Sequence, residues 1–224
     1  MNSSIVNQRG WSIVRWCLAL TVSVAVLPAG AQLPQERIQE LETALQVQPQ
    51  EVRYLVELGR LYAEVGRIRD GLTLLERAVG IAPQHPGARA WLGSLQVRMA
   101  RTTQGTSEQL QWFKKGTRSM DEAVEEFPDV AVVYLIRGIS GVLIPDRFQR
   151  YLISIQDFNK VLELKAQDPT ALPDAQMPLV YLNLGLAYKK NNQKAEARAT
   201  WEQGRQRYPQ SKETAQMGQE LNTL

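Results

Sequence analysis

The side chains best suited to catalysis are scarce in this sequence, which has one histidine and one cysteine among 224 residues. A metal site, or a nucleophile activated by a base, needs several such groups close together. His85 stands alone between Pro83 and Pro86, where the prolines predict a turn. Cys17 lies at the start of an apolar N-terminal run. We therefore expect neither residue to be catalytic or to bind a metal.

The carboxylates do not suggest acid/base chemistry either. Glu122, Glu125 and Glu126 are close in sequence, but they fall on a predicted helix rich in lysine and arginine, which is typical of a solvated face. The glycines do not form a phosphate-binding loop followed by a lysine. The sequence therefore predicts a protein that is not an enzyme and that uses no cofactor.

The charge balance argues against nucleic acid as a partner. The chain has 26 basic and 23 acidic residues, and the first 31 residues contain Arg9, Arg15 and no acid. The rest of the chain then carries 26 − 2 = 24 basic and 23 acidic residues, a net charge of +1. Such dispersed charges lack the basic stripe that neutralises a phosphate backbone.

Residues 1–31 have the three parts of a secretory signal: a basic start, an apolar run from Trp16 to Leu27 and small residues ending at Ala31. The run of 12 residues is shorter than the roughly 20 that a membrane-spanning helix needs. We therefore expect cleavage after Ala31, export to a periplasmic or luminal compartment, and a mature chain of residues 32–224 without cysteine. The alternative is an uncleaved segment that anchors the protein to a membrane.

The sequence repeats itself. Seven positions that begin at Leu58 recur in type and spacing 126 residues later, from Leu184 onward. The first set is Leu58, Gly59, Tyr62, Gly71, Leu75, Ala78 and Pro83, and the second is Leu184, Gly185, Tyr188, Ala197, Trp201, Gly204 and Pro209.

Two longer units lie between these sets, so the predicted repeats span about 52–85, 86–130, 131–169 and 178–210. The extra residues fall in the polar stretch Arg101–Glu108, at Pro145-Asp146 and in the proline-rich stretch Asp168–Pro178. A half repeat precedes the first unit at 34–50, and a capping helix follows the last at 211–224.

These intervals resemble those of tetratricopeptide repeats over about residues 34–210. The resemblance implies an all-α solenoid of antiparallel helix hairpins, closed here by the C-terminal capping helix. It also implies that the first helix of each hairpin lines a concave surface that binds a protein or peptide. The third repeat departs from the pattern, because Arg137 replaces the usual leucine and Gly141 the usual tyrosine.

The first helix of that third repeat, Ala131–Ile144, is apolar around nearly its whole circumference, which indicates burial on more than one side. One explanation is that the chain covers it, through Asp168–Pro178 or the terminal helix. The other is an exposed apolar groove, shared with Leu182 and Leu186, that awaits a partner.

We therefore predict a scaffold or adaptor of the cell envelope that helps a membrane or envelope complex to assemble. Its expected partner-binding residues, chosen by helix face, are Arg60, Trp91, Leu135, Ile139, Leu182, Leu186 and Lys189. One alternative is a permanent structural subunit that docks through the long connections. Another is a small-ligand carrier or enzyme whose connections cap a pocket, although no convergent set of chemical groups favours it.

Overall fold

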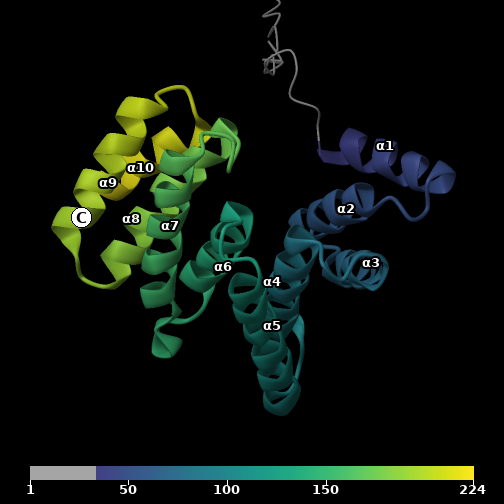
Figure 1. The fold of residues 1–224 in the computed structure, drawn as a ribbon. Helices are drawn as coiled ribbons and strands as arrows, with labels where there is room; N and C mark the ends of the chain where they lie inside the picture. The colour runs from purple at the N-terminus through teal and green to yellow at the C-terminus, as the bar shows by residue number, and fades with distance from the viewer. Residues whose placement is uncertain (1–33) are drawn as a thin grey trace, which may run out of the picture. The chain divides into compact units, whose positions relative to one another are not determined.

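Residues 34–224 are the part of the chain that the computed structural model describes, and they form ten α-helices and two short 3-10 helices without a strand (Figure 1). The helices are α1 (Pro34–Val47), α2 (Val52–Glu64), α3 (Ile68–Ile81), α4 (Pro86–Thr102), α5 (Thr106–Glu126), α6 (Ala131–Leu143), η1 (Asp146–Phe148), α7 (Arg150–Gln167), η2 (Asp174–Gln176), α8 (Met177–Lys190), α9 (Lys194–Arg207) and α10 (Lys212–Asn222). The predicted all-α fold of sequential hairpins is confirmed. The predicted signal segment lies outside the described residues.

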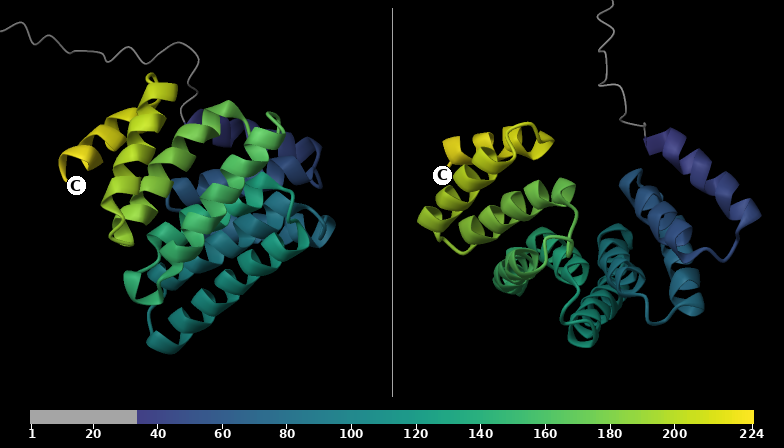
Figure 2. Two further views of the ribbon diagram at one scale, coloured as in Figure 1. Left: turned by 60° about the vertical axis from the view of Figure 1, so that its left-hand side comes forward. Right: turned by 45° about the horizontal axis from the view of Figure 1, so that its top comes forward.

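The helices pack in the order in which they occur along the chain (Figure 2). Four hairpins form, in which α2 packs on α3, α4 on α5, α6 on α7 and α8 on α9. The second helix of each hairpin packs on the first helix of the next, and successive first helices also touch. At the ends, α1 packs on α2, and α10 packs on both α8 and α9. Each unit is therefore held by its neighbours, as in other repeat arrays.

Small residues let the two helices of a hairpin approach each other closely. In the first hairpin, a Cβ atom at Gly71 would overlap the carbonyl oxygen of Gly59 on the facing helix. In the fourth hairpin, Gly185 leaves room for the Trp201 ring, whose Nε1 donates a hydrogen bond to the Leu182 carbonyl at 3.0 Å. The small residues of the repeat pattern thus mark the points of closest helix contact.

Helix starts are set locally. His85 is the N-cap of α4, where its Nδ1 accepts a hydrogen bond from the Ala88 amide at 3.1 Å, and Pro86 follows at the first helical position. Ser211 occupies the N-cap position of α10, but its hydroxyl hydrogen-bonds with Thr214 Oγ1 at 3.1 Å and caps no backbone amide. The lone histidine therefore has a structural task that its sequence context did not reveal.

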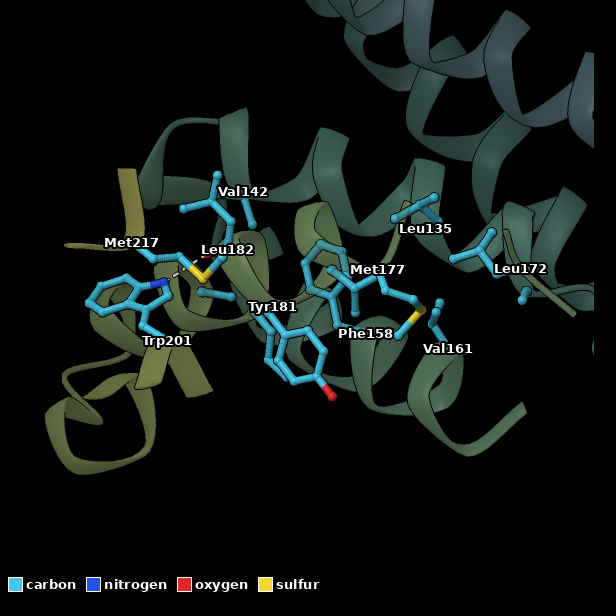
Figure 3. Packing of buried hydrophobic residues seen from close by; sticks show 14 of the residues in the cluster. Leu135, Val142, Phe158, Val161, Leu172, Met177, Tyr181, Leu182, Trp201 and Met217 are labelled. Atoms are coloured by element: carbon cyan, nitrogen blue, oxygen red, sulfur yellow. Dashed lines mark hydrogen bonds between the residues drawn. The ribbon is translucent and has the colours of Figure 1, made fainter. Parts of the chain in front are cut away.

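The largest hydrophobic cluster of the described residues lies in the C-terminal half and joins α6 to α10 (Figure 3). Phe158 of α7, Tyr181 of α8 and Trp201 of α9 are its largest side chains, and all three are almost completely buried. Smaller clusters join α1 to α6. All these clusters fall within residues 38–224, so the compact unit Leu33–Leu224 has a core of its own.

The apolar helix α6 is covered mainly by the chain itself. Val133 and Ile136 pack against α4 and α5, whereas Leu135 belongs to the large cluster together with residues of α7 and α8. Leu172, from the proline-rich connection, belongs to this cluster and is 1% exposed. The chain therefore covers most of α6, but mainly through the neighbouring helices α4, α5, α7 and α8 and not through Asp168–Pro178 or the terminal helix, as the first explanation had it. Among its large apolar side chains, Leu143 at the C-terminal end stays open, at 59% exposed.

Candidate partner-binding surface

The seven predicted partner-binding residues lie on the first helices α2, α4, α6 and α8, as the repeat pattern implies. We call the outward side chains of these four helices the first-helix surface. Arg60, Trp91, Ile139, Leu186 and Lys189 are partly exposed on it. Leu135 and Leu182 are only 4% and 5% exposed and contribute to the core beneath it.

The N-terminal end of the first-helix surface is charged. Arg60 forms an ion pair with Glu64 one turn further along α2. Next to it, Glu57 accepts two hydrogen bonds from the Arg37 guanidinium of α1, at 2.8 and 3.0 Å. The hydrogen bonds from Arg37 lower the pKa of the Glu57 carboxyl. This end therefore presents cations and carboxylates that already pair with each other.

In the middle of the first-helix surface, side-chain contacts join α4 to its neighbours α2 and α6. Trp91 on α4 is partly buried and packs against two core clusters. The Arg98 side chain donates to the Ala63 carbonyl of α2 at 2.6 Å, and the hydroxyls of Ser94 and Ser140 lie 2.9 Å apart between α4 and α6. These contacts hold α2, α4 and α6 in a fixed relation.

The C-terminal end brings four of the predicted residues together. Leu135, Ile139, Leu182 and Leu186 all belong to the large cluster or pack against it. Lys189, one turn beyond Leu186 on α8, reaches Glu220 of α10 at 2.8 Å and the hydroxyl of Thr223 at 3.0 Å. This end is therefore apolar with one bound cation, whereas Arg60 belongs to the charged end.

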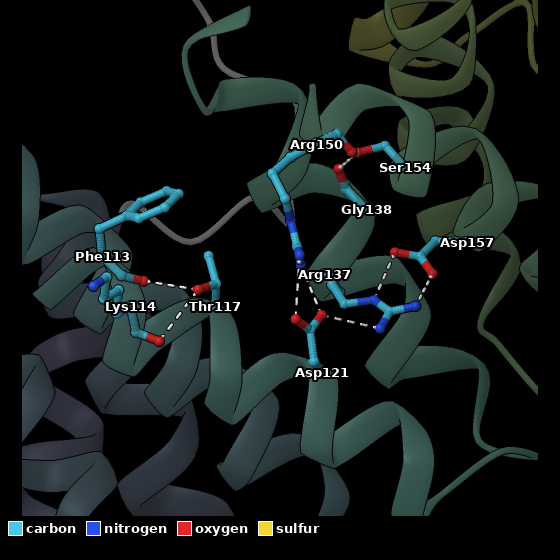
Figure 4. A network of polar contacts seen from close by, with 9 residues as sticks. All are labelled: Phe113, Lys114, Thr117, Asp121, Arg137, Gly138, Arg150, Ser154 and Asp157. Atoms are coloured by element: carbon cyan, nitrogen blue, oxygen red, sulfur yellow. Dashed lines mark hydrogen bonds and ion pairs between the residues drawn. The ribbon is translucent and has the colours of Figure 1, made fainter. Parts of the chain in front are cut away.

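A buried polar network beneath the surface was missed by the analysis of sequence (Figure 4). Arg137 of α6 donates two hydrogen bonds to Asp157 of α7, at 2.6 and 3.0 Å, and one to Asp121 of α5, at 3.1 Å. Arg150 at the start of α7 donates two more to Asp121, at 2.7 and 3.1 Å. The network therefore joins three helices from two repeats.

The sequence did contain a signal for this network. Arg137 replaces a leucine that the repeat pattern would bury, so a buried arginine needed a carboxylate partner. Asp157 lies 20 residues away, the same separation as that between Arg37 and Glu57. Gly141 has a related role, because a Cβ atom there would overlap the Ser154 hydroxyl, which donates to the Gly138 carbonyl at 2.8 Å.

Within residues 34–224, His, Cys, Asp and Glu side chains form no group of three or more that could hold a metal ion. Over the same residues, no helix combines the length and the apolar character needed to cross a bilayer.

The fold defines the protein as a repeat array of helix hairpins. The tetratricopeptide repeat family matches residues 179–211, which contain α9 and nearly all of α8. That family is a structural repeat and not a catalytic one. Among curated proteins, none matches the chain.

The chain is also similar to several solved structures. TTC0263, a thermophilic tetratricopeptide repeat protein of Thermus thermophilus, is 17% identical with a TM-score of 0.71, over 85% of this chain and 91% of that one. A MamA protein is 18% identical over 77% of this chain and 81% of its own, with a TM-score of 0.47. MamA of Desulfovibrio magneticus RS-1 is 16% identical over 80% and 88%, with a TM-score of 0.49. The likeness to TTC0263 shows a shared fold, and residues 179–211 match one tetratricopeptide repeat.

Proposed function

We propose that this protein is an exported scaffold of the cell envelope that holds a partner protein, or a segment of one, on its first-helix surface. Tetratricopeptide repeats generally bind protein partners. The observation that carries the proposal is the partial exposure of Arg60, Trp91, Ile139, Leu186 and Lys189 on consecutive first helices. A ligand laid along these helices would meet charged groups at one end and apolar groups at the other.

The two ends favour a partner segment of matching polarity. Ile139 and Leu186 rest on a well-packed cluster, so apolar side chains of a partner can cover them without rearranging the core. The side chain of Arg60 is 35% exposed and exchanges its Glu64 partner for another carboxylate at low cost. The expected ligand is therefore an amphipathic helix or extended segment with acidic and apolar residues.

Matched variants test this proposal. Arg60→Glu and Leu186→Glu alter the first-helix surface, while Arg69→Glu and Ile81→Glu make the same kind of change at exposed positions of α3. Proteins crosslinked to the wild type in cells are compared with those crosslinked to each variant, after circular dichroism confirms unchanged helix content. Loss of the same partner from both first-helix variants, but from neither control, is the expected result. Equal capture by all four would move the interface elsewhere.

The envelope location rests on the predicted signal segment and has its own test. N-terminal sequencing of the protein from its native host is expected to return Gln32. An intact N-terminus in the membrane fraction would replace the exported form with an anchored one.

A permanent structural subunit is the second candidate, favoured by the apolar side chains that the long connections and their flanking turns expose. Leu110, Phe148 and Leu152 are each at least 37% exposed there. Obligate subunits hide larger apolar areas than transient binders do. If the isolated unit aggregates with normal helix content, and substitutions at these positions restore its solubility, this candidate gains over the first.

A further inference from the structure

Helix α5 and the connection that follows α6 meet at an aromatic contact. Phe113, in the second turn of α5, and Phe148, in η1, have ring centroids 4.5 Å apart. Within five residues of these rings in sequence, Leu110 is 44%, Leu152 39% and Leu143 59% exposed, while Phe148 itself is 37% exposed. We call Leu110, Phe113, Leu143, Phe148 and Leu152 the connection patch.

Residues of the connection patch and its neighbours contact the core and α8. Phe113 packs on the buried cluster of Val97, Met120 and Ile144, so α5 and the segment leading into η1 share one core. Asp146, in the same 3-10 helix as Phe148, forms an ion pair with Lys190 of α8 at 2.6 Å. Both sides of the Phe113–Phe148 contact are therefore attached to the rest of the fold.

The charges beside the patch are mostly unpaired cations. Within the described residues, Lys114 and Arg147 are exposed and form no ion pair, and the guanidinium of Arg147 lies 4.8 Å from the centre of the Phe148 ring. Of the nearby carboxylates, Asp146 is paired with Lys190, whereas Glu108 accepts a hydrogen bond from the neutral Trp112 indole at 3.3 Å and keeps its charge. The surface thus combines projecting apolar groups with free positive charge.

We propose that the connection patch docks on an anionic lipid surface. Leucine and phenylalanine side chains that project from a basic surface can enter the boundary between headgroups and acyl chains, while lysine and arginine attract anionic lipids. The combination of several exposed apolar side chains with unpaired cations suits an anionic bilayer, which needs no matching pocket or register.

This inference is independent of the partner proposed for the first-helix surface, and each can fail alone. The test uses the unit Leu33–Leu224, which has its own core and lacks the apolar N-terminal run that would bind vesicles by itself. A cooperative thermal transition first establishes that the unit is folded. Co-sedimentation is then measured with vesicles of phosphatidylcholine alone and of phosphatidylcholine mixed with phosphatidylglycerol.

We expect binding to the mixed vesicles only, weakening as salt is added. The double variant Phe148→Ser, Leu152→Ser should bind at least about tenfold more weakly, because it removes the largest inserting groups. Lys114→Gln and Arg147→Gln should each reduce binding about fivefold. The control Val47→Ser, Ile81→Ser changes two exposed apolar residues at the ends of α1 and α3 and should bind like wild type.

Three results would overturn the proposal. One is no binding of the folded unit to the anionic vesicles at low salt. Another is equal loss in the patch and control variants, which would place the contact elsewhere or make it nonspecific. The third is a purified protein partner that the patch variants lose while vesicle binding is absent, which would assign the patch to a subunit interface. Because the two charge variants leave the apolar packing intact, a folding defect in Phe148→Ser, Leu152→Ser does not decide the outcome.

Discussion

Two arginine–carboxylate pairs, each separated by 20 residues in sequence, join helices in the N-terminal part and in the middle of this protein in different ways. Arg37 and Glu57 join α1 to α2, and their side chains are 36% and 35% exposed. Arg137 and Asp157 join α6 to α7, and their side chains are 14% and 1% exposed. The chemical pairing is the same, with two hydrogen bonds in each, but the surroundings differ.

The surroundings decide what each pair does. At the exposed pair, hydrogen bonding to Arg37 lowers the pKa of Glu57, whereas burial raises the pKa of Asp157 even though Arg137 opposes it. Water can replace either partner of the first pair but not of the second. The buried pair therefore dictates which helices can pack together, and the exposed pair adds a small increment to a contact already made by Leu41 and Leu58.

The largest expected effect comes from breaking the buried pair. Arg137→Leu restores the residue that is usual in the repeat but leaves Asp157 as a buried charge without its partner. We expect unfolding to become about 3–5 kcal/mol easier, a fall in melting temperature of roughly 10 °C or more for a domain of this size. Thermal denaturation followed by circular dichroism measures it.

A double variant tests whether the loss of stability comes from the unpaired charge of Asp157. Arg137→Leu, Asp157→Leu removes both charges and leaves Arg150 paired with Asp121, so most of the lost stability should return. If the double variant melts as low as Arg137→Leu alone, the two residues do not act as a pair.

Gly141→Ala should have the next largest effect, because the added methyl group would overlap the Ser154 hydroxyl and push α6 away from α7. We expect the free energy of unfolding to fall by about 1–3 kcal/mol, as measured by urea denaturation. Gly80→Ala is the matched control on α3, where a Cβ atom meets nothing within 4 Å, and it should be stabilising by up to about 1 kcal/mol. Equal shifts in the two variants would show that the α6–α7 spacing is not tight.

Breaking the exposed pair should matter much less. Glu57→Gln at neutral pH is expected to cost about 0.2–1 kcal/mol, because both side chains are about one-third exposed. Increased hydrogen exchange of α1 amides, with those of α7 unchanged, would locate the loss. A destabilisation as large as that of Arg137→Leu would contradict the contrast between the two pairs.

Lowering the pH should remove the contribution of the Glu57 carboxylate to the stability of the folded protein. Its pKa is lower in the folded protein than its ordinary value of 4.5, so its stabilisation is complete above that pH and is lost as the pH falls through the folded value. The stability difference between wild type and Glu57→Gln should therefore shrink below about pH 4.5. Asp157 should behave in the opposite sense, because a raised pKa in the folded state makes protonation favour the native form. If the stability difference between wild type and Glu57→Gln grew as the pH fell, the pKa of Glu57 would not be lowered in the folded protein.

Much of the fold could be predicted from particular residues. The spacing of Leu58 to Pro83 and its recurrence at Leu184 to Pro209 predicted the first and last hairpins, because each position serves a contact between neighbouring helices. The helix predicted over Pro34–Val47 is α1. The expected partner-binding residues were chosen by helix face alone, and their role stays a prediction. Face alone could not tell that Leu135 and Leu182 are buried while Ile139 and Leu186 are partly open.

The sequence by itself determined the helix hairpins and their order, since these depend on residues within one repeat or the next. Only the tertiary structure decided what covers α6, how Arg137 is neutralised and where apolar side chains stay exposed. The reason is that these features depend on side chains from several helices and on the long connections, whose lengths follow no repeat. Leu172 reaches the cluster of Leu135, and Phe148 reaches the ring of Phe113, across separations that no periodic pattern encodes.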